Sequence, residues 1–156
     1  MPSSRPSRDS TNRMFNVRIY GLLIHSGHLL AVEEPFQGKK IVKLPGGGLE
    51  FGEGTIDALH REFKEELNVE VKVERHAYTT DFFIRSFLRP EEQVIAIYYF
   101  VSCPVWSASD NLPSLESQEK GQRFFWVPVT EQIGDHFDLA IDKAALTHIQ
   151  KEALLP

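Results

Sequence analysis

The sequence has only one cysteine, Cys103, in 156 residues. A single thiol excludes an intramolecular disulfide framework, and it excludes a metal site built from several thiolates. Nothing in the chain therefore requires an oxidising compartment, and we expect the protein to be cytoplasmic.

Long apolar runs and an excess of positive charge are also lacking. The longest apolar stretches, 21–24 and 94–101, are far shorter than the roughly 18 residues that a membrane-spanning helix requires. Lysine and arginine number 17 against 22 aspartates and glutamates, for a formal net charge of −5. Proteins that bind nucleic-acid polymers gain much of their affinity from excess lysine and arginine. We therefore expect neither a membrane nor a nucleic-acid polymer as partner, and an anionic ligand would need a local cation.

The composition is that of one folded domain. Hydrophobic residues make up 42% of the chain and aromatic residues 11%, which is enough for a core. No internal repeat divides the sequence. Residues 1–13 are rich in serine and arginine and lack an apolar face, so we expect a disordered tail over 1–13 and a single domain over 14–156. The alternative for the tail is a transit-like segment, which Asp9 disfavours.

Strand signals come first along the chain. Alternating β-branched and aromatic residues over 15–33, interrupted by the turn pair Ser26-Gly27, predict a β-hairpin. A short apolar piece at 41–44 leads into Pro-Gly-Gly-Gly at 45–48, which favours a loop over a regular element. Further β-rich runs occupy 69–73, 76–87, 93–101 and 124–127, and the last two are separated by a long polar loop at 104–122.

Helical spacing appears twice. The apolar residues of the first segment recur every three or four positions: Ile56, Leu59, Phe63 and Leu67. They predict a helix over 55–67 with Thr55 as its N-cap. A second helical rhythm over 138–154 predicts a final amphipathic helix. Several strands with two helices packed against them predict an α/β fold.

Three carboxylates share one side of the first helix. At about 100° per residue, Glu62, Glu65 and Glu66 lie within an arc of roughly 100° beside the apolar stripe. As a solvated helix face they would be unfavourable, because they form like-charge pairs three and four residues apart and oppose the helix dipole near its C-terminal end. A hard divalent cation such as Mg²⁺ reverses these penalties, since it takes carboxylate oxygens as ligands. This pattern favours a metal site.

The glycines at 46–48 fit the same purpose. Gly46, Gly47 and Gly48 let the backbone approach a ligand closely and expose its carbonyl and amide groups. A plain tight turn explains the glycines equally well on their own. The loop and the acidic helix together make a stronger signal.

The segment 47–69 resembles the Nudix box, a motif of fixed glycine, glutamate, arginine and apolar positions. The matching residues are Gly47, Glu53, Arg61, Glu62, Phe63, Glu65, Glu66 and Val69. The one departure is Asn68, where the family has glycine. Asparagine also tolerates the left-handed conformation at the end of a helix, so the turn is expected to be kept.

The resemblance implies a fold and a set of roles. The fold is a Nudix-type α/β/α sandwich with a mixed central sheet. Mg²⁺, with Mn²⁺ as a substitute, would be held by Glu62, Glu65 and Glu66 with the carbonyl of Gly46. Arg61 would orient these carboxylates by ion pairing. Glu53 would support the loop or a bound water.

One further glutamate, from outside the box, acts at the metal in several family members. The resemblance points to Glu119, which precedes Trp126, with Glu116 as the next choice. A solvated loop glutamate is the alternative reading for both. The general base that takes a proton from the attacking water would be Glu62 or Glu119.

The implied activity is hydrolysis of a diphosphate linkage in a nucleoside diphosphate derivative, such as a nucleoside triphosphate or a nucleotide sugar, by attack of water on phosphorus. Gly47, Gly48, Arg18 and Phe83 are the candidate substrate-binding residues. The segment near 84–87 has neither of the Pro or Tyr residues that mark some subtypes, so it identifies no particular nucleotide. Self-association into a homodimer is left open.

Two other functions remain open. A catalytically silent domain of the same fold would sense a nucleotide or bind a protein, although it would not need the whole carboxylate set. Isomerases also use this fold, but Cys103 does not stand in a recognisable context for a nucleophile.

Overall fold

The computed structural model describes residues 13–87, 89–153 and 155. Apart from Arg13, the expected N-terminal tail lies outside these residues. The elements occur in the order β1 (Met14–His25), β2 (His28–Phe36), β3 (Lys39–Lys43), β4 (Gly46–Gly48), α1 (Thr55–Leu67), β5 (Lys72–Thr79), β6 (Glu92–Ser102), β7 (Arg123–Pro128), the 3₁₀ helix η1 (Ile133–His136) and α2 (Ala140–Lys151).

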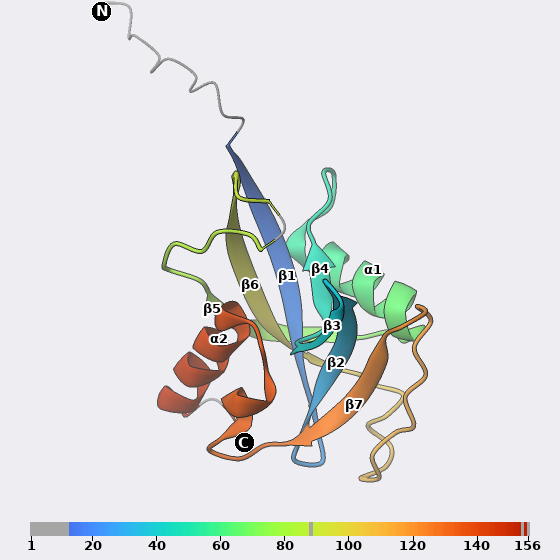
Figure 1. Ribbon diagram of the computed structural model, residues 1–156. Helices are drawn as coiled ribbons and strands as arrows, with labels where there is room; N and C mark the ends of the chain where they lie inside the picture. The colour runs from blue at the N-terminus through green and yellow to red at the C-terminus, as the bar shows by residue number, and fades with distance from the viewer. Residues whose placement is uncertain (1–12, 88, 154, 156) are drawn as a thin grey trace, which may run out of the picture.

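Strand β1 lies at the centre of the sheet (Figure 1). It pairs in parallel with β6 and antiparallel with β4, and it forms the expected hairpin with β2. Strand β2 continues to β3 and β7, and β6 continues to β5, each time antiparallel. The result is a seven-stranded mixed sheet whose main path is β3-β2-β1-β6-β5.

The two helices cover opposite sides of this sheet (Figure 1). Successive side chains of a strand alternate between its faces, and β1 has apolar residues at both sets of positions. Ile19 and Leu23 pack in the core beneath α1, whereas Tyr20 and Leu22 pack in the core beneath α2. The predicted α/β/α sandwich with a mixed central sheet is therefore confirmed. None of the helices in the described ranges is long and apolar enough to cross a membrane.

Helix α1 has the predicted bounds but a different cap. The N-cap is Gly54, whose N–H donates to the Asp57 carboxylate at 2.9 Å, and not Thr55. The Thr55 hydroxyl is instead hydrogen-bonded to Tyr99 at 2.8 Å, so a tertiary contact takes the side chain that the local pattern assigned to capping. At the other end Asn68 adopts the expected left-handed conformation, with φ 54°.

Two strand predictions are wrong. Residues 46–48 form β4 rather than a loop, because their backbone pairs with β1 between Arg18 and Tyr20. The strand expected over 76–87 ends at Thr79. Beyond it the pairing with β6 is interrupted and resumes only as an isolated bridge between Arg85 and Gln93. Phe83 is exposed, so the apolar sequence there does not mark a buried strand.

The close contact between α1 and β1 depends on Gly21. A Cβ atom at this position would lie 2.7 Å from the Phe63 ring and 3.2 Å from Val101. We expect Gly21→Ala to lower the free energy of unfolding by about 1–3 kcal/mol, since overpacking forces neighbouring side chains off their rotamers. Urea denaturation measures the change. Gly134→Ala is the matched control, because a Cβ there meets nothing within 4 Å, and a Gly21→Ala protein as stable as that control would refute the packing argument.

Candidate active site

Arg61 connects the carboxylates of α1 to the glycine-rich strand. Its guanidinium donates to Glu53 at 2.6 and 3.0 Å, to Glu62 at 2.9 Å and to Glu65 at 3.4 Å. It also donates to the carbonyl of Gly48 at 3.0 Å. A planar guanidinium is suited to such forked bonding to carboxylates. Arg61 therefore brings four of the predicted site residues to one place.

Glu53 is held in its charged form by these bonds. The hydrogen bonds from Arg61, followed by one from the backbone N–H of Glu50 at 2.8 Å, lower the pKa of Glu53 to about 2. In return the carboxylates, Glu53 first, raise the pKa of Arg61. Glu53 and Arg61 both stay ionised near neutral pH, so the ion pair between them is kept.

Glu62 lies directly against β4. Its carboxylate occupies the space that a Cβ atom on Gly47 would need, with the carboxyl carbon at 2.6 Å from that position. Any residue with a side chain at position 47 would displace the carboxylate. Gly47 is therefore required for close approach of an acidic group to the backbone, and Gly46 is next to it in the strand.

The three glutamates of α1, Glu62, Glu65 and Glu66, form a carboxylate cluster. Glu66 is the most deeply buried of the three, with 7% of its surface exposed. Burial, and then the neighbouring carboxylates Glu62, Glu119 and Glu34, raise its pKa to about 8, although Lys43 acts in the opposite direction. Several carboxylates thus repel one another around Glu66. A bound cation would relieve this repulsion.

Glu119 reaches the cluster because its loop is attached to α1. The N–H of Gln118 donates to the carbonyl of Glu66 at 2.8 Å, and the Trp126 indole fixes the same loop by donating to Pro113 at 3.0 Å. Glu119 is one of the leading groups that raise the pKa of Glu66. Of the two loop glutamates, the structure brings Glu119 to the helix.

The carboxylates of α1 and the carbonyl of Gly46 are chemically suited to bind a hard cation, but the carboxylates do not point toward one common position. Carboxylate and carbonyl oxygens are the ligands that Mg²⁺ prefers. Within the described ranges, no three Asp, Glu, His or Cys side chains are already arranged to hold a metal ion. The reason lies in the ion pairs, since Glu62 and Glu65 are both turned toward Arg61. Rotation of these two carboxylates is needed to bring them to a common ligand.

The raised pKa of Glu66 predicts a pH dependence of stability in the absence of metal. The folded state holds the Glu66 proton up to about pH 8, whereas an unfolded glutamate releases it near its ordinary pKa of about 4.3. The resulting stability is fully present below the lower value and is lost as pH rises through the higher one. We expect the free energy of unfolding in EDTA to fall between about pH 5 and pH 8.

The variant Glu66→Gln isolates this contribution because it cannot ionise. Urea denaturation of parent and variant over the same pH range should give a smaller loss of stability in the variant. Parallel curves for the two proteins would show that Glu66 does not titrate as described.

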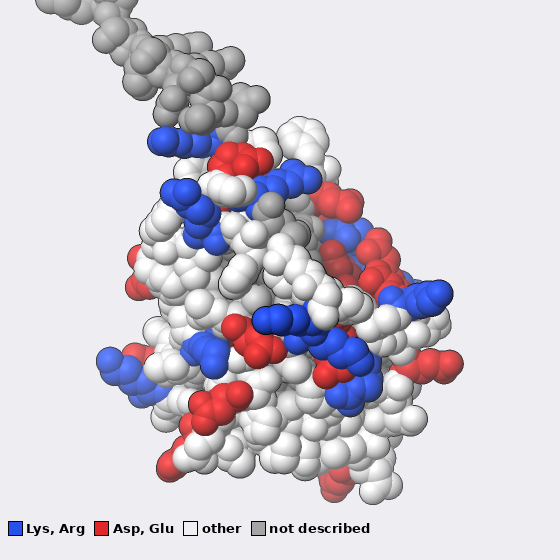
Figure 2. Space-filling model, viewed as in Figure 1, with Lys and Arg blue, Asp and Glu red and all other residues white. Residues whose placement is uncertain are grey.

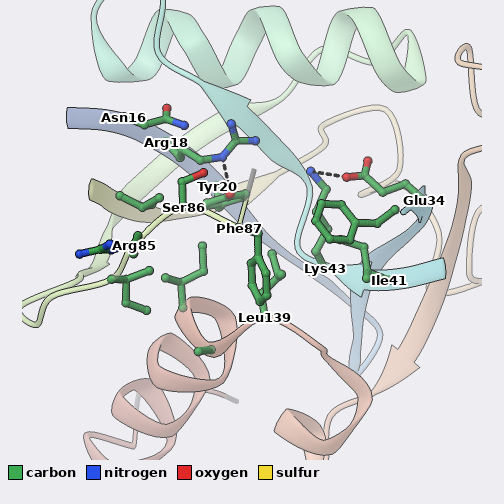
Figure 3. A pocket seen from close by; sticks show the side chains of 15 residues that line it. Asn16, Arg18, Tyr20, Glu34, Ile41, Lys43, Arg85, Ser86, Phe87 and Leu139 are labelled. Carbon is green, nitrogen blue, oxygen red and sulfur yellow. Dashed lines mark hydrogen bonds and ion pairs between the residues drawn. The ribbon is translucent and has the colours of Figure 1, made fainter. Parts of the chain in front are cut away.

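A pocket opens beside the acidic cluster, between β1, β3 and the start of α2 (Figure 3). Three alternate residues of β1, Asn16, Arg18 and Tyr20, line one wall. Arg18 donates to the Tyr20 hydroxyl at 2.7 Å. The remaining lining residues are Glu34, Phe36, Ile41, Lys43, Ile84, Arg85, Ser86, Phe87, Val94, Leu139, Ala140 and Ile141.

The wall of this pocket rests on a buried hydrogen-bonded network. Tyr20 stacks on Tyr98 with ring centroids 5.2 Å apart. Tyr98 donates to the fully buried Asp142 at 2.6 Å, and Asp142 also accepts from the N–H of Leu44 at 3.0 Å. Burial raises the pKa of Asp142 to about 6. The network ties α2 to the strands that carry the pocket.

The pocket supplies local positive charge that the chain as a whole lacks. Arg18, Lys43 and Arg85 line it together with the single carboxylate of Glu34. Elsewhere on the face in Figure 2, charges of both signs are mixed. An anionic ligand therefore finds its cations in the pocket rather than on a broad basic surface.

Of the candidate substrate residues, the structure brings Arg18, Gly47 and Gly48 close to the cluster but not Phe83. Phe83 does not line the pocket, and 63% of its surface is exposed. The aromatic side chains at the pocket are Phe36 and Phe87, whose rings meet edge to face with centroids 5.8 Å apart.

Sequence reasoning did not identify Glu34 and Lys43 as site residues. The local sequence of their segment shows only a largely polar stretch, 34–40, followed by the short apolar piece at 41–44. Strand alternation is the signal that would have found Lys43, because it lies two residues after Ile41 and faces the same side. Pairing of β2 with β3, which brings Glu34 opposite Ile41, is not visible in the local pattern.

Comparison with solved structures supports the fold. The crystal structure of the MutT protein from Methanosarcina mazei Go1 gives a TM-score of 0.72, with 17% identity over 92% of this chain and 99% of that one. The solution structure of the E. coli ORF135 protein gives a TM-score of 0.66, with 20% identity over 92% and 95% of the two chains.

A third structure is longer than this chain. A bifunctional NMN adenylyltransferase/ADP ribose pyrophosphatase from Francisella tularensis, complexed with AMP and a Mn ion, gives a TM-score of 0.61 and 21% identity. The match covers 88% of this chain and 41% of that one. At these identities the likeness establishes the fold alone. No curated protein matches the chain.

A family model gives the assignment. The model described as the NUDIX domain matches residues 13–148, which include the sheet, α1 and nearly all of α2. The matched range therefore contains both the carboxylate cluster and the adjoining pocket. On this match, the chain belongs to the NUDIX domain family, whose members are generally pyrophosphohydrolases.

Proposed function

We propose that this protein is a Mg²⁺-dependent hydrolase that splits a diphosphate linkage in a nucleoside diphosphate derivative. The observation that carries this proposal is that the pocket and the carboxylate cluster adjoin at Arg18. Arg18 lines the pocket, and the charge of Glu62 contributes to raising its pKa. A ligand in the pocket would present an anionic group to Arg18 and to the acidic helix together.

The protein groups that would hold Mg²⁺ are Glu62, Glu65, Glu66 and the carbonyl of Gly46, and Mn²⁺ would serve as a substitute. Bound there, the cation supplies charge neutralisation at phosphate oxygens and a lowered pKa for a bound water. Arg61 keeps the carboxylates oriented through the bonds described above. The Francisella tularensis protein was solved with AMP and a Mn ion, which supports a divalent cation and a nucleotide as ligands here.

The proton of the attacking water passes to a carboxylate of this chain. Glu119 is one candidate for the base, since its loop is fastened to α1 beside Glu66. Glu62 is the other, because its carboxylate lies against β4 at the edge of the cluster. Arg18 would bind and orient the phosphate group, as a fork of N–H donors suits phosphate oxygens.

The pocket accounts for a nucleoside better than for a small phosphate alone. Its apolar residues, among them Phe36, Ile41 and Phe87, form a surface for a flat ring. Arg18, Lys43 and Glu34 add charged groups to these apolar walls, a combination that is typical of small-molecule sites.

A nucleotide-sensing domain without catalysis is the second candidate. The observation that favours it is that Glu62 and Glu65 are engaged by Arg61 rather than gathered for a metal ion. Tight nucleotide binding without turnover would distinguish it from a hydrolase.

A substrate screen with Mg²⁺ tests the proposal. Nucleotide sugars, ADP-ribose and dinucleoside polyphosphates are incubated with the protein and then with alkaline phosphatase. Nucleoside triphosphates, which alkaline phosphatase attacks directly, are instead assayed for the release of nucleoside monophosphate and pyrophosphate. Cleavage of a diphosphodiester yields phosphomonoesters, from which phosphatase releases inorganic phosphate, whereas the intact substrate resists it. Failure to turn over any of these compounds would refute the proposed activity.

A further inference from the structure

An ion pair lies inside the pocket, at the end nearest to β2 and β3. Lys43 and Glu34 approach each other at 3.2 Å, and both line the pocket (Figure 3). Only 8% of the Lys43 side chain and 24% of the Glu34 side chain are exposed. The pair is thus shielded from solvent and faces the space that a ligand would fill.

Neither member of the pair uses all its hydrogen-bonding capacity. A lysine ammonium has three N–H donors, and among the described residues Glu34 is the one ionic or hydrogen-bonding partner of the Lys43 side chain. A carboxylate has about four acceptor positions. Glu34 uses one toward Lys43 and one toward the Gln122 amide at 3.0 Å. The pair therefore retains adjacent donor and acceptor positions.

The surroundings favour a flat ring at this place. Phe36, Ile41 and Phe87 line the same pocket. Gln122 and Lys43 together fix the orientation of the Glu34 carboxylate, so its remaining acceptor positions have a defined direction. Buried polar groups arranged in this way recognise a ligand by its hydrogen-bonding pattern, because a mismatched ligand leaves them unpaired.

We propose that Glu34 and Lys43 recognise the edge of a guanine base. The proposal rests on the proposed function and names the substrate class of that site. Guanine presents a carbonyl oxygen followed by two N–H donors along one edge. Lys43 would donate to the carbonyl oxygen, and Glu34 would accept from the ring N–H and from the exocyclic amino group.

The other bases match this pair less well. The corresponding edges of adenine and cytosine have one exocyclic amino group next to an unprotonated ring nitrogen, which accepts rather than donates. Uracil has a single ring N–H between two carbonyl oxygens. Only guanine offers two neighbouring donors to one carboxylate together with an acceptor for the ammonium.

Binding of nucleoside monophosphates without metal gives a direct test. GMP and IMP form the decisive comparison, since IMP lacks only the exocyclic amino group and keeps the carbonyl and the ring N–H. Isothermal titration calorimetry should give a Kd for GMP that is at least about tenfold lower than that for IMP, the size expected for a hydrogen bond to a charged group. AMP and UMP should bind more weakly than GMP.

Two substitutions separate the roles of the pair. Glu34→Gln should reduce the GMP preference over IMP to within about threefold, because the amide offers one acceptor where the carboxylate offers two. Lys43→Met should weaken GMP and IMP binding by a similar factor, of about tenfold, and leave their ratio unchanged, since both share the carbonyl oxygen. Glu33→Gln is the matched control, because Glu33 is in the same strand but pairs with Lys40 and Arg123 outside the pocket. Thermal melts establish that each variant is folded.

Equal affinity of the parent for GMP and IMP would overturn the inference, as would an unchanged preference in Glu34→Gln. If the parent hydrolyses nucleotides without preferring guanine, this inference fails while the proposed function stands. If no nucleotide is bound or hydrolysed, both fail.

Discussion

Replacing Glu65 or Glu66 by glutamine should lower the rate of hydrolysis by at least about a hundredfold, which corresponds to roughly 2.7 kcal/mol of transition-state stabilisation. Each substitution keeps the shape of the side chain but removes a charge that the proposed metal site needs. Steady-state rates with millimolar Mg²⁺ measure the loss. Glu70→Gln is the matched control, since Glu70 is exposed and, among the residues that the structure describes, forms its ion pair with Lys64, away from the cluster.

The same two variants should differ in stability when metal is removed. Glu66 is buried among carboxylates, so Glu66→Gln should be as stable as the parent or more stable in EDTA. Glu65 is largely exposed, with one ion pair to Arg61 at 3.4 Å, and such pairs contribute little. Mg²⁺ should raise the melting temperature of the parent more than that of either variant. Equal shifts in all proteins, with activity retained, would show that these glutamates are only a solvated face.

Arg61→Lys should destabilise the protein and impair hydrolysis together. A lysine cannot reproduce the fork that holds Glu53, Glu62 and the carbonyl of Gly48. We expect the free energy of unfolding in EDTA to fall by about 2 kcal/mol, the size of losing hydrogen bonds to charged groups. Hydrolysis should fall by at least about tenfold, because misplaced carboxylates bind the metal less well.

Urea denaturation and steady-state kinetics on the same preparations test both parts. Arg89→Lys is the control for the change of residue type, since Arg89 is exposed and forms its ion pair with Glu92, outside the carboxylate cluster. An Arg61→Lys protein with the stability and activity of that control would contradict the role given to Arg61.

The features that the sequence predicted are those that depend on local spacing. Helix α1 was predicted with its observed bounds because its apolar residues repeat with the helical period. The hairpin of β1 and β2 followed from strand alternation and the Ser26-Gly27 turn. The left-handed Asn68 followed from the few residue types that tolerate this conformation.

The features that the sequence did not predict depend on partners far away along the chain. The glycines at 46–48 have low strand propensity, yet they form β4 because β1 supplies the hydrogen-bonding partners. Thr55 was assigned to a cap that Gly54 and Asp57 provide, since the Tyr99 hydroxyl competes for its side chain.

The pocket, too, could be predicted from the sequence only where it depends on local spacing. Its wall of alternate β1 residues was within reach of the sequence pattern, because a strand places every second side chain on one face. The meeting of Glu34 with Lys43 was not, since it depends on the register between β2 and β3. Phe83 was chosen for its aromatic ring, but the pocket is instead lined by Phe36 and Phe87.

The dependence of turnover on a divalent cation tests the central claim most directly. A substrate identified in the screen is incubated with the protein before chelation, after exhaustive chelation, and after Mg²⁺ or Mn²⁺ is added back. We predict that chelation abolishes hydrolysis and that either cation restores it, because the carboxylate cluster has no other means of engaging an anionic diphosphate. Undiminished turnover after exhaustive chelation would contradict the assignment of the acidic helix as a metal site.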